Sequence, residues 1–188
     1  MKRAETVTRL LVVVALGVVV AGSFLVVDVT SPPWYERLRY PLRYEQIVRG
    51  HSRNYGIDPA LVAAVIYQES KFDAGARSGS GAVGLMQLRP DTAKGIAVRT
   101  GGSAFRVADL TNPEINVRYG CWYLRHLYRK YGEWRLVLAA YNAGQGNVDR
   151  WRDEGRDDIP FAETRHYVDR VEELRSTYRH AWRAELYA

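Results

Sequence analysis

Helix start signals divide most of the chain, and they constrain its fold more than any other feature. An aspartate or asparagine followed by proline occurs at residues 58–59 and 112–113. This is the pattern of a capping side chain with a proline in the first helical turn. Apolar residues recur at helical spacing between these signals, and no alternating strand pattern of useful length appears. Residues 44–188 are therefore predicted to form a mainly α-helical domain.

An uncharged apolar run stands near the N-terminus. It covers residues 10–27, LLVVVALGVVVAGSFLVV, and follows a short basic tail over residues 1–9. As a helix rising ~1.5 Å per residue, these 18 residues come close to spanning the ~30 Å hydrocarbon layer. The run is also longer than the apolar part of most secretory signals. It predicts an uncleaved transmembrane anchor, with a cleavable signal peptide as the alternative.

Residues 28–43 are predicted to form a linker beside the membrane. The paired prolines at 32–33 disfavour a helix. Three aromatic residues near them suit a membrane interface, although packing on the domain is the alternative: Trp34, Tyr35 and Tyr40. Positive charges stand on both sides of the apolar run, so charge counting does not choose its orientation.

The basic net charge excludes few kinds of binding partner. The chain carries 27 basic and 21 acidic residues, a net charge of +6 that is spread along the sequence rather than gathered in one block. Such a spread does not favour nucleic acid as a partner. The single cysteine, Cys121, cannot form an internal disulfide. The histidines have no cysteine or carboxylate at ligand spacing, so no metal or other cofactor is expected.

A glutamate ends the apolar run that follows residues 58–59. In a helix, Glu69 shares a face with Val65 and Ile66. Burial disfavours the charged form of a carboxyl group, so the pKa of Glu69 is expected to rise. A carboxyl that is protonated near neutral pH can serve as a general acid at a glycosidic oxygen. The alternative is a solvated glutamate at the helix end, paired with Lys71.

Several short motifs carry a resemblance to a known family. They are ESKF at residues 69–72, SGSGAVGLMQ at 78–87, AYNAG at 140–144 and ETRHYV at 163–168. In this order and spacing they closely resemble the SLT family of lytic transglycosylases. The resemblance implies a lysozyme-like, all-helical catalytic domain. It also implies cleavage of peptidoglycan between N-acetylmuramic acid and N-acetylglucosamine.

The resemblance implies a role for each matching residue. Glu69 would be the sole catalytic group, acting first as acid and then as base, while the C6 hydroxyl attacks C1 and leaves a 1,6-anhydromuramic end. Tyr141 and Asn142 would orient Glu69 and keep its pKa high. Substrate binding is implied for seven residues: Ser70, Ser78, Met86, Gln87, Tyr141, Asn142 and Glu163.

Structural alternatives stand beside these roles. Ser70 could simply end its helix, Met86 could be a core residue, and Glu163 could pair with Arg165 or Arg118. Two alternative functions also remain, a goose-type lysozyme-like hydrolase and a catalytically idle peptidoglycan-binding module.

The sequence thus predicts a bacterial enzyme held in the cytoplasmic membrane by one helix, with its domain outside the cytoplasm. That side is inferred from where the family's substrate lies. Peptidoglycan strands are the expected partner, and an anionic cell wall suits the basic net charge.

Overall fold

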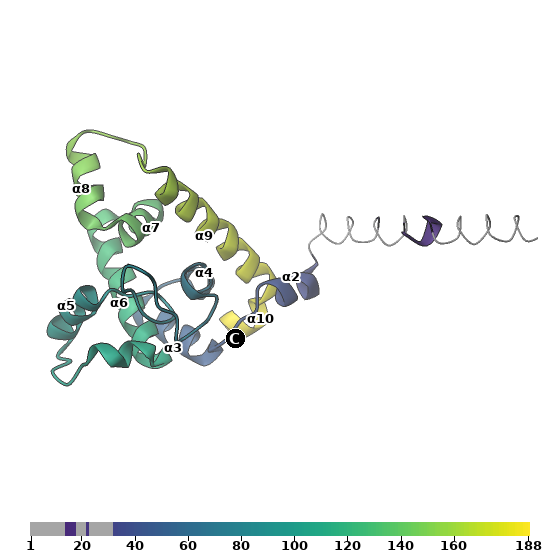
Figure 1. Cartoon of the computed structure of the whole chain (residues 1–188), viewed down its shortest axis with the longest axis horizontal. Coiled ribbons are helices and arrows are strands. Elements are labelled where there is room, and N and C mark those ends of the chain that lie inside the picture. Colours follow the sequence, from purple (N-terminus) through teal and green to yellow (C-terminus); the bar gives the residue numbers. More distant parts are fainter. Residues whose placement is uncertain (1–13, 18–21, 23–31) are drawn as a thin grey trace, which may run out of the picture. The chain divides into compact units, whose positions relative to one another are not determined.

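The computed structural model describes residues 14–17, 22 and 32–188 (Figure 1). The chain divides into two compact units, Met1–Pro41 and Leu42–Ala188. In the first unit, helix α2 spans Pro33–Arg39. The expectation that the paired prolines disfavour a helix here is wrong. Pro33 stands at the start of α2, where a missing N–H costs no hydrogen bond and the fixed φ suits a helix.

The predicted membrane anchor over residues 10–27 lies outside the described residues, except for residues 14–17 and 22. Residues 14–17 are helical and exposed. Among the described residues, no helix combines the length and apolar character needed to cross a bilayer.

The second unit is built from helices. In chain order they are α3 (Glu45–Tyr55), α4 (Pro59–Ser70), α5 (Pro90–Thr100), the 3₁₀ helix η1 (Val107–Thr111), α6 (Pro113–Tyr131), α7 (Trp134–Ala143), α8 (Gln145–Asp153), α9 (Ala162–Ala181) and α10 (Arg183–Tyr187). Its described residues form no strand, and Val83 makes isolated bridges to Arg77 and Leu88. The predicted mainly helical fold is confirmed.

Both predicted helix starts are present. The Asp58 side chain accepts a hydrogen bond from the Ala60 N–H at 3.1 Å and caps α4. The Asn112 side chain caps α6 in the same way, accepting from the Glu114 N–H at 2.9 Å. These caps satisfy N–H groups that lack a partner within the helix.

Helix α4 forms the centre of the unit. Every residue from 60 to 66 is buried, so the helix has no solvent face over this stretch. It packs chiefly against α9, which runs beside it in Figure 1, and also contacts α3 and α10. A helix buried on all sides is a core element, and its C-terminal end brings Glu69 to the edge of that core.

The C-terminal part differs from the prediction in two places. The helix starts named above do not include that of α8 over residues 145–153, and apolar spacing alone does not predict the interruption between α9 and α10 at Trp182. At this break the backbone turns to φ −119° and ψ 29°. Helix α10 then packs on α3 and α4 as well as on α9, so the interruption closes the chain back onto the core.

Candidate functional site

The C-terminal end of α4 is shaped by an unusual backbone. Ser70 is the last helical residue, and the next two residues, Lys71 and Phe72, have φ values of 51° and 64°. Left-handed conformations are costly for residues with side chains and often occur at functional sites. The Phe72 ring is completely buried and holds this turn in place. The turn stops the helix one residue after Glu69.

Glu69 is partly buried and has a single resolved hydrogen-bond partner in the described chain. The Tyr167 hydroxyl donates to Glu69 Oε1 at 2.6 Å. Burial raises the pKa of Glu69 to about 7, and the hydrogen bond from Tyr167 opposes part of that rise. Near neutral pH the carboxyl is therefore divided between its protonated and charged forms, which suits a group that must both give and take a proton.

Tyr167 is the contact that the sequence reasoning missed. It is 98 positions from Glu69 in the chain, although it belongs to the ETRHYV motif. On α9 it shares the buried face with Thr164, Val168 and Val171. A buried hydroxyl requires a hydrogen-bond partner, so this inward-facing tyrosine was the available signal.

Tyr141 and Asn142 end α7 near this carboxyl, but they bond elsewhere. The Tyr141 hydroxyl donates to the Met86 carbonyl oxygen at 2.6 Å. Asn142 Oδ1 accepts from the Thr164 hydroxyl at 2.9 Å. Burial and then the nearby charge of Glu69 raise the pKa of Tyr141. The raised pKa of Glu69 thus comes from burial, and not from the predicted hydrogen bonds to these two residues.

A buried asparagine holds the glycine-containing loop in front of α6. Asn116 donates to the carbonyl oxygens of Val83 at 2.9 Å and Leu110 at 2.8 Å, and it accepts from the Met86 N–H at 2.8 Å. Gly84 has φ 82°, and a Cβ there would lie 2.2 Å from Asn116 Nδ2. Only glycine permits this close approach, which explains its place in the loop.

Ser70, Gln87 and Ser78 also stabilise this loop. Ser70 donates to the Leu85 carbonyl oxygen at 2.8 Å, which joins the end of α4 to the loop. Gln87 Nε2 donates to the carbonyl oxygens of Ala76 at 3.1 Å and Gly84 at 2.9 Å. Ser78 Oγ accepts from the Ala82 N–H at 3.0 Å and remains exposed.

Met86, for which the resemblance implies substrate binding, lies inside the protein. It has no exposed surface, and a Cβ on Gly120 of α6 would lie 2.1 Å from its sulfur. The side chain therefore belongs to the core, as the structural alternative required. Its contribution to the site is its backbone carbonyl, which accepts from Tyr141.

Glu163 lies exposed in the first turn of α9. Arg165 instead donates to the carbonyl oxygens of Ile159 and Pro160, at 2.6 and 2.8 Å. Neither Arg165 nor Arg118 forms an ion pair with Glu163 in the described chain. Over residues 14–17, 22 and 32–188, no three His, Cys, Asp or Glu side chains are grouped to hold a metal ion.

The family model for the transglycosylase SLT domain matches residues 46–160, which include Glu69 and the loop and α7 around it. The chain belongs to this family. The soluble lytic murein transglycosylase of Salmonella typhimurium is 36% identical over 153 residues, 76% of this chain and 24% of the relative. The endo-type membrane-bound lytic murein transglycosylase A of Klebsiella pneumoniae is 36% identical over 113 residues, 58% of this chain and 56% of the relative.

Solved structures of SLT proteins share the fold. An inactive glutamate-to-glutamine mutant of the lytic transglycosylase Slt from Pseudomonas aeruginosa superposes with a TM-score of 0.72 at 34% identity, covering 79% of this chain and 26% of that chain. The 70 kDa soluble lytic transglycosylase of Escherichia coli also gives a TM-score of 0.72, at 33% identity, over 78% of this chain and 25% of that chain. The predicted lysozyme-like SLT fold is confirmed. The chain spans about a quarter of the length of the first of these relatives.

Proposed function

We propose that this protein is a peptidoglycan lytic transglycosylase with Glu69 as its only catalytic acid and base. It would cleave the β-1,4 bond between N-acetylmuramic acid and N-acetylglucosamine and leave 1,6-anhydromuramic ends. The proposal is carried by the partly buried carboxyl of Glu69, whose pKa of about 7 suits proton transfer in both directions. The SLT family and the names of the relatives support it.

The chemistry follows from the two protonation states of Glu69. In the neutral form, the carboxyl donates its proton to the glycosidic oxygen as the bond to C1 breaks. The resulting carboxylate then takes the proton of the C6 hydroxyl, whose oxygen attacks C1 and closes the anhydro ring. One proton leaves the carboxyl and one returns, so no water is consumed. Tyr167, bonded to Oε1, holds the carboxyl in one orientation and stabilises its charged form after the first step.

A second catalytic carboxylate is not required in this scheme. The 2-acetamido group of the sugar can assist at C1, where ordinary glycosidases use a second carboxylate of the enzyme. Asp73, the nearest acidic residue along the chain, accepts a hydrogen bond from the Gly75 N–H at 2.8 Å. We therefore assign Asp73 to the turn after α4.

The residues around Glu69 would bind the glycan strand. Ser78, Asn142 and Glu163 are exposed and offer hydroxyl, amide and carboxylate groups to sugar or peptide. Ser70, Gln87 and Tyr141 hydrogen-bond to backbone carbonyls and would position the loop that faces the strand.

The localisation is also part of the proposal. The apolar run over residues 10–27 would anchor the chain in the bacterial cytoplasmic membrane, with residues 28–43 leading to an extracytoplasmic domain over residues 44–188. The membrane-bound relatives support this arrangement. Alkaline extraction of bacterial membranes tests it. An anchored chain stays with the membrane pellet, and release of the whole chain into the supernatant would contradict the anchor.

Mass spectrometry of the products tests the activity. Full-length protein in neutral detergent is incubated with purified peptidoglycan, beside the Glu69→Gln variant, which keeps the side-chain shape without a transferable proton. Wild type should release 1,6-anhydromuropeptides, and the variant should be at least about 10³-fold slower. Reducing muramic ends would identify a hydrolase instead. Retained turnover above a few per cent in the variant would remove Glu69 from its role.

A further inference from the structure

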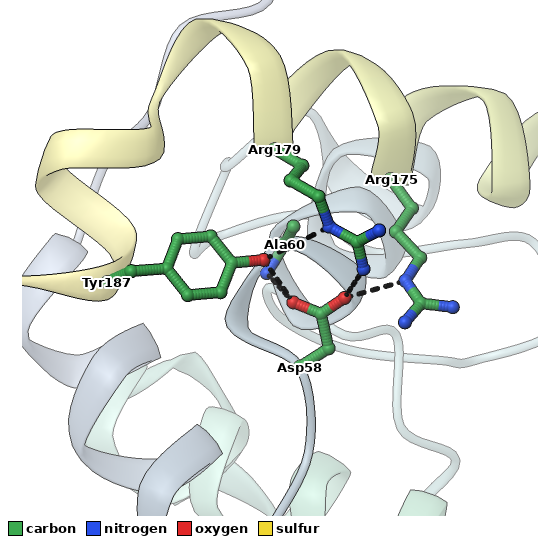
Figure 2. A network of polar contacts seen from close by, with 5 residues as sticks. All are labelled: Asp58, Ala60, Arg175, Arg179 and Tyr187. Atoms are coloured by element: carbon green, nitrogen blue, oxygen red, sulfur yellow. Dashed lines mark hydrogen bonds and ion pairs between the residues drawn. The ribbon is translucent and has the colours of Figure 1, made fainter.

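A second polar cluster lies at the opposite end of α4 from Glu69. Figure 2 shows Asp58, the capping residue of α4, facing Arg175 and Arg179 of α9 and Tyr187 of α10. These four residues and Arg183 line one surface pocket, and no other described residue lines it. The pocket therefore belongs to the junction of α4, α9 and α10.

Most hydrogen bonds in this cluster converge on the carboxylate, and Arg179 Nε also donates to the Tyr187 hydroxyl at 3.4 Å. Arg175 Nε donates to Asp58 Oδ2 at 2.7 Å, and the Arg179 guanidinium donates to the same oxygen. The Tyr187 hydroxyl donates to Asp58 Oδ1. Asp58 is thus fully engaged, with only 14% of its side chain exposed.

The cationic groups are not fully engaged. Three guanidinium groups face one carboxylate, so the lining groups carry a formal charge of +2. A guanidinium has five N–H donors, and Arg175 uses one of them in its bond to Asp58. Arg183 has no hydrogen bond or ion pair within the described part of the chain. The pocket offers free, charged and fork-shaped donors, and such donors match the oxygens of a phosphate group.

We infer that this pocket binds the phosphate of an anionic lipid headgroup. Tyr187, with 47% of its surface exposed, adds the amphipathic ring that is common where protein meets the membrane interface. The location also fits. Helix α10 packs on α3, and Arg49 in the second turn of α3 donates to the carbonyl oxygen of Ala188.

The chain enters this domain at α3. Residue 45 follows residue 27 by 18 positions, and because α2 lies between them, the linker reaches less than the roughly 60 Å of a fully extended chain. The choice of a lipid headgroup rests on the membrane anchor proposed above. With that anchor in place, the linker keeps the domain within reach of the headgroups, whose negative surface potential attracts arginine side chains.

Hydrogen exchange of the full-length protein in nanodiscs tests this inference. Amides of residues 172–188 are compared in discs of phosphatidylcholine alone and in discs that also contain phosphatidylglycerol. Exchange should be about fivefold slower with the anionic lipid, the factor expected for one arginine near such a surface. Arg183→Gln should remove this protection. Arg183→Lys should retain part of it, because lysine keeps the charge but lacks the paired N–H donors of the guanidinium group.

Arg129→Gln is the matched control. Arg129 is exposed at the end of α6 and has no hydrogen bond or ion pair in the described chain, so the variant removes the same charge at another surface. It should keep the protection. Unchanged exchange of amides in α4 checks that Arg183→Gln leaves the fold intact.

Three results would overturn the inference. They are equal exchange in both kinds of disc, equal loss of protection in the Arg183 and Arg129 variants, and the same protection from millimolar glycerol phosphate in discs without anionic lipid. The last would identify a site for soluble phosphate. Release of anhydromuropeptides is measured in the same preparations and should be equal in wild type and Arg183→Gln. Its failure in both would count against the proposed enzyme activity and leave the lipid result standing.

Discussion

The two ends of α4 each carry a carboxyl group, and their surroundings have opposite effects. At the start of the helix, burial would raise the pKa of Asp58, but hydrogen bonds from Tyr187 and two arginines outweigh it and lower the pKa. At the other end, burial raises the pKa of Glu69 to about 7, and its one tyrosine partner offsets only part of the rise. Burial acts in the same direction at both sites.

The difference lies in the cationic partners of Asp58 and in the deeper burial of Glu69. Arginine partners from α9 favour the charged form of Asp58, and together with Tyr187 of α10 they join three helices. The absence of a resolved cationic partner in the described surroundings of Glu69 leaves that group able to exchange a proton. Helix α4 thus carries a structural carboxylate at its start and a candidate catalytic carboxyl at its end. Their different surroundings give them opposite pKa shifts.

Replacing Glu69 should have the largest effect on stability. The change should be stabilising at high pH, whereas removing one partner of an ordinary ion pair is destabilising. The folded protein holds the Glu69 proton up to about pH 7, whereas the unfolded chain loses it near 4.5. Stability therefore falls as the pH rises from about 4.5 to 7, by about 3 kcal/mol in all. Glu69→Gln should match wild type at pH 4 and exceed it by up to about 3 kcal/mol at pH 8, measured by urea unfolding.

The exposed Glu163 supplies the control for this measurement. Glu163→Gln should leave stability unchanged at both pH values, since an exposed carboxyl gains little from folding. A Glu69→Gln variant that is less stable than wild type at pH 8 would show that the carboxylate is stabilised by its surroundings, and the contrast with Asp58 would disappear.

Asp58→Asn should give the next largest effect, and it should be destabilising. Asparagine keeps the helix cap but loses the charge that holds the arginines, at a cost of about 2 kcal/mol near pH 7. Because the folded pKa of Asp58 is lowered, this contribution is present above the ordinary aspartate pKa and is lost as the pH falls through the folded value.

Chemical unfolding of wild type and Asp58→Asn at a series of pH values measures this loss. Asp58→Ala, which also removes the cap, should cost about 1 kcal/mol more. If Asp58→Asn were as stable as wild type at pH 7, the arginine cluster would contribute no net stability to the fold.

A matched pair of tyrosine variants gives the smallest effects and sharpens the comparison most. Tyr167→Phe removes the hydrogen bond that lowers the pKa of Glu69, so the pH above which activity is lost should move upward by about half a unit. Tyr187→Phe removes the corresponding bond at Asp58 and should leave that activity limit unchanged. The pH dependence of anhydromuropeptide release measures both. A downward move in Tyr167→Phe would mean that Tyr167 stabilises the protonated acid.

Local signals in the sequence were enough to predict the helical class of the domain and the starts of α4 and α6. The caps at Asp58 and Asn112 act on neighbouring N–H groups, so their effect can be predicted from a few residues. The apolar spacing before Glu69 likewise predicted a carboxyl at the edge of the core. Pro33 was misjudged because proline stops a helix from within but starts one at its first position.

The parts that escaped prediction depend on distant contacts. Tyr167 reaches Glu69 across 98 positions, and no local pattern encodes that pairing. The interruption at Trp182 has no breaker residue and is accompanied by contacts of α10 with α3 and α4. Met86 was assigned to substrate binding by its motif, whereas its place beside Gly120 is set by how closely the loop approaches α6.

The interruption at Trp182 also bears on the order in which the contacts of α4 form during synthesis. Tyr187 meets Asp58 across 129 positions of the chain. At a synthesis rate of about 5–20 residues per second, Asp58 is made roughly 6 to 26 seconds before Tyr187. During that interval the carboxylate at the start of α4 lacks its last partner. The polar cluster at the start of α4 is therefore complete only after the residues that follow Trp182 have packed against it.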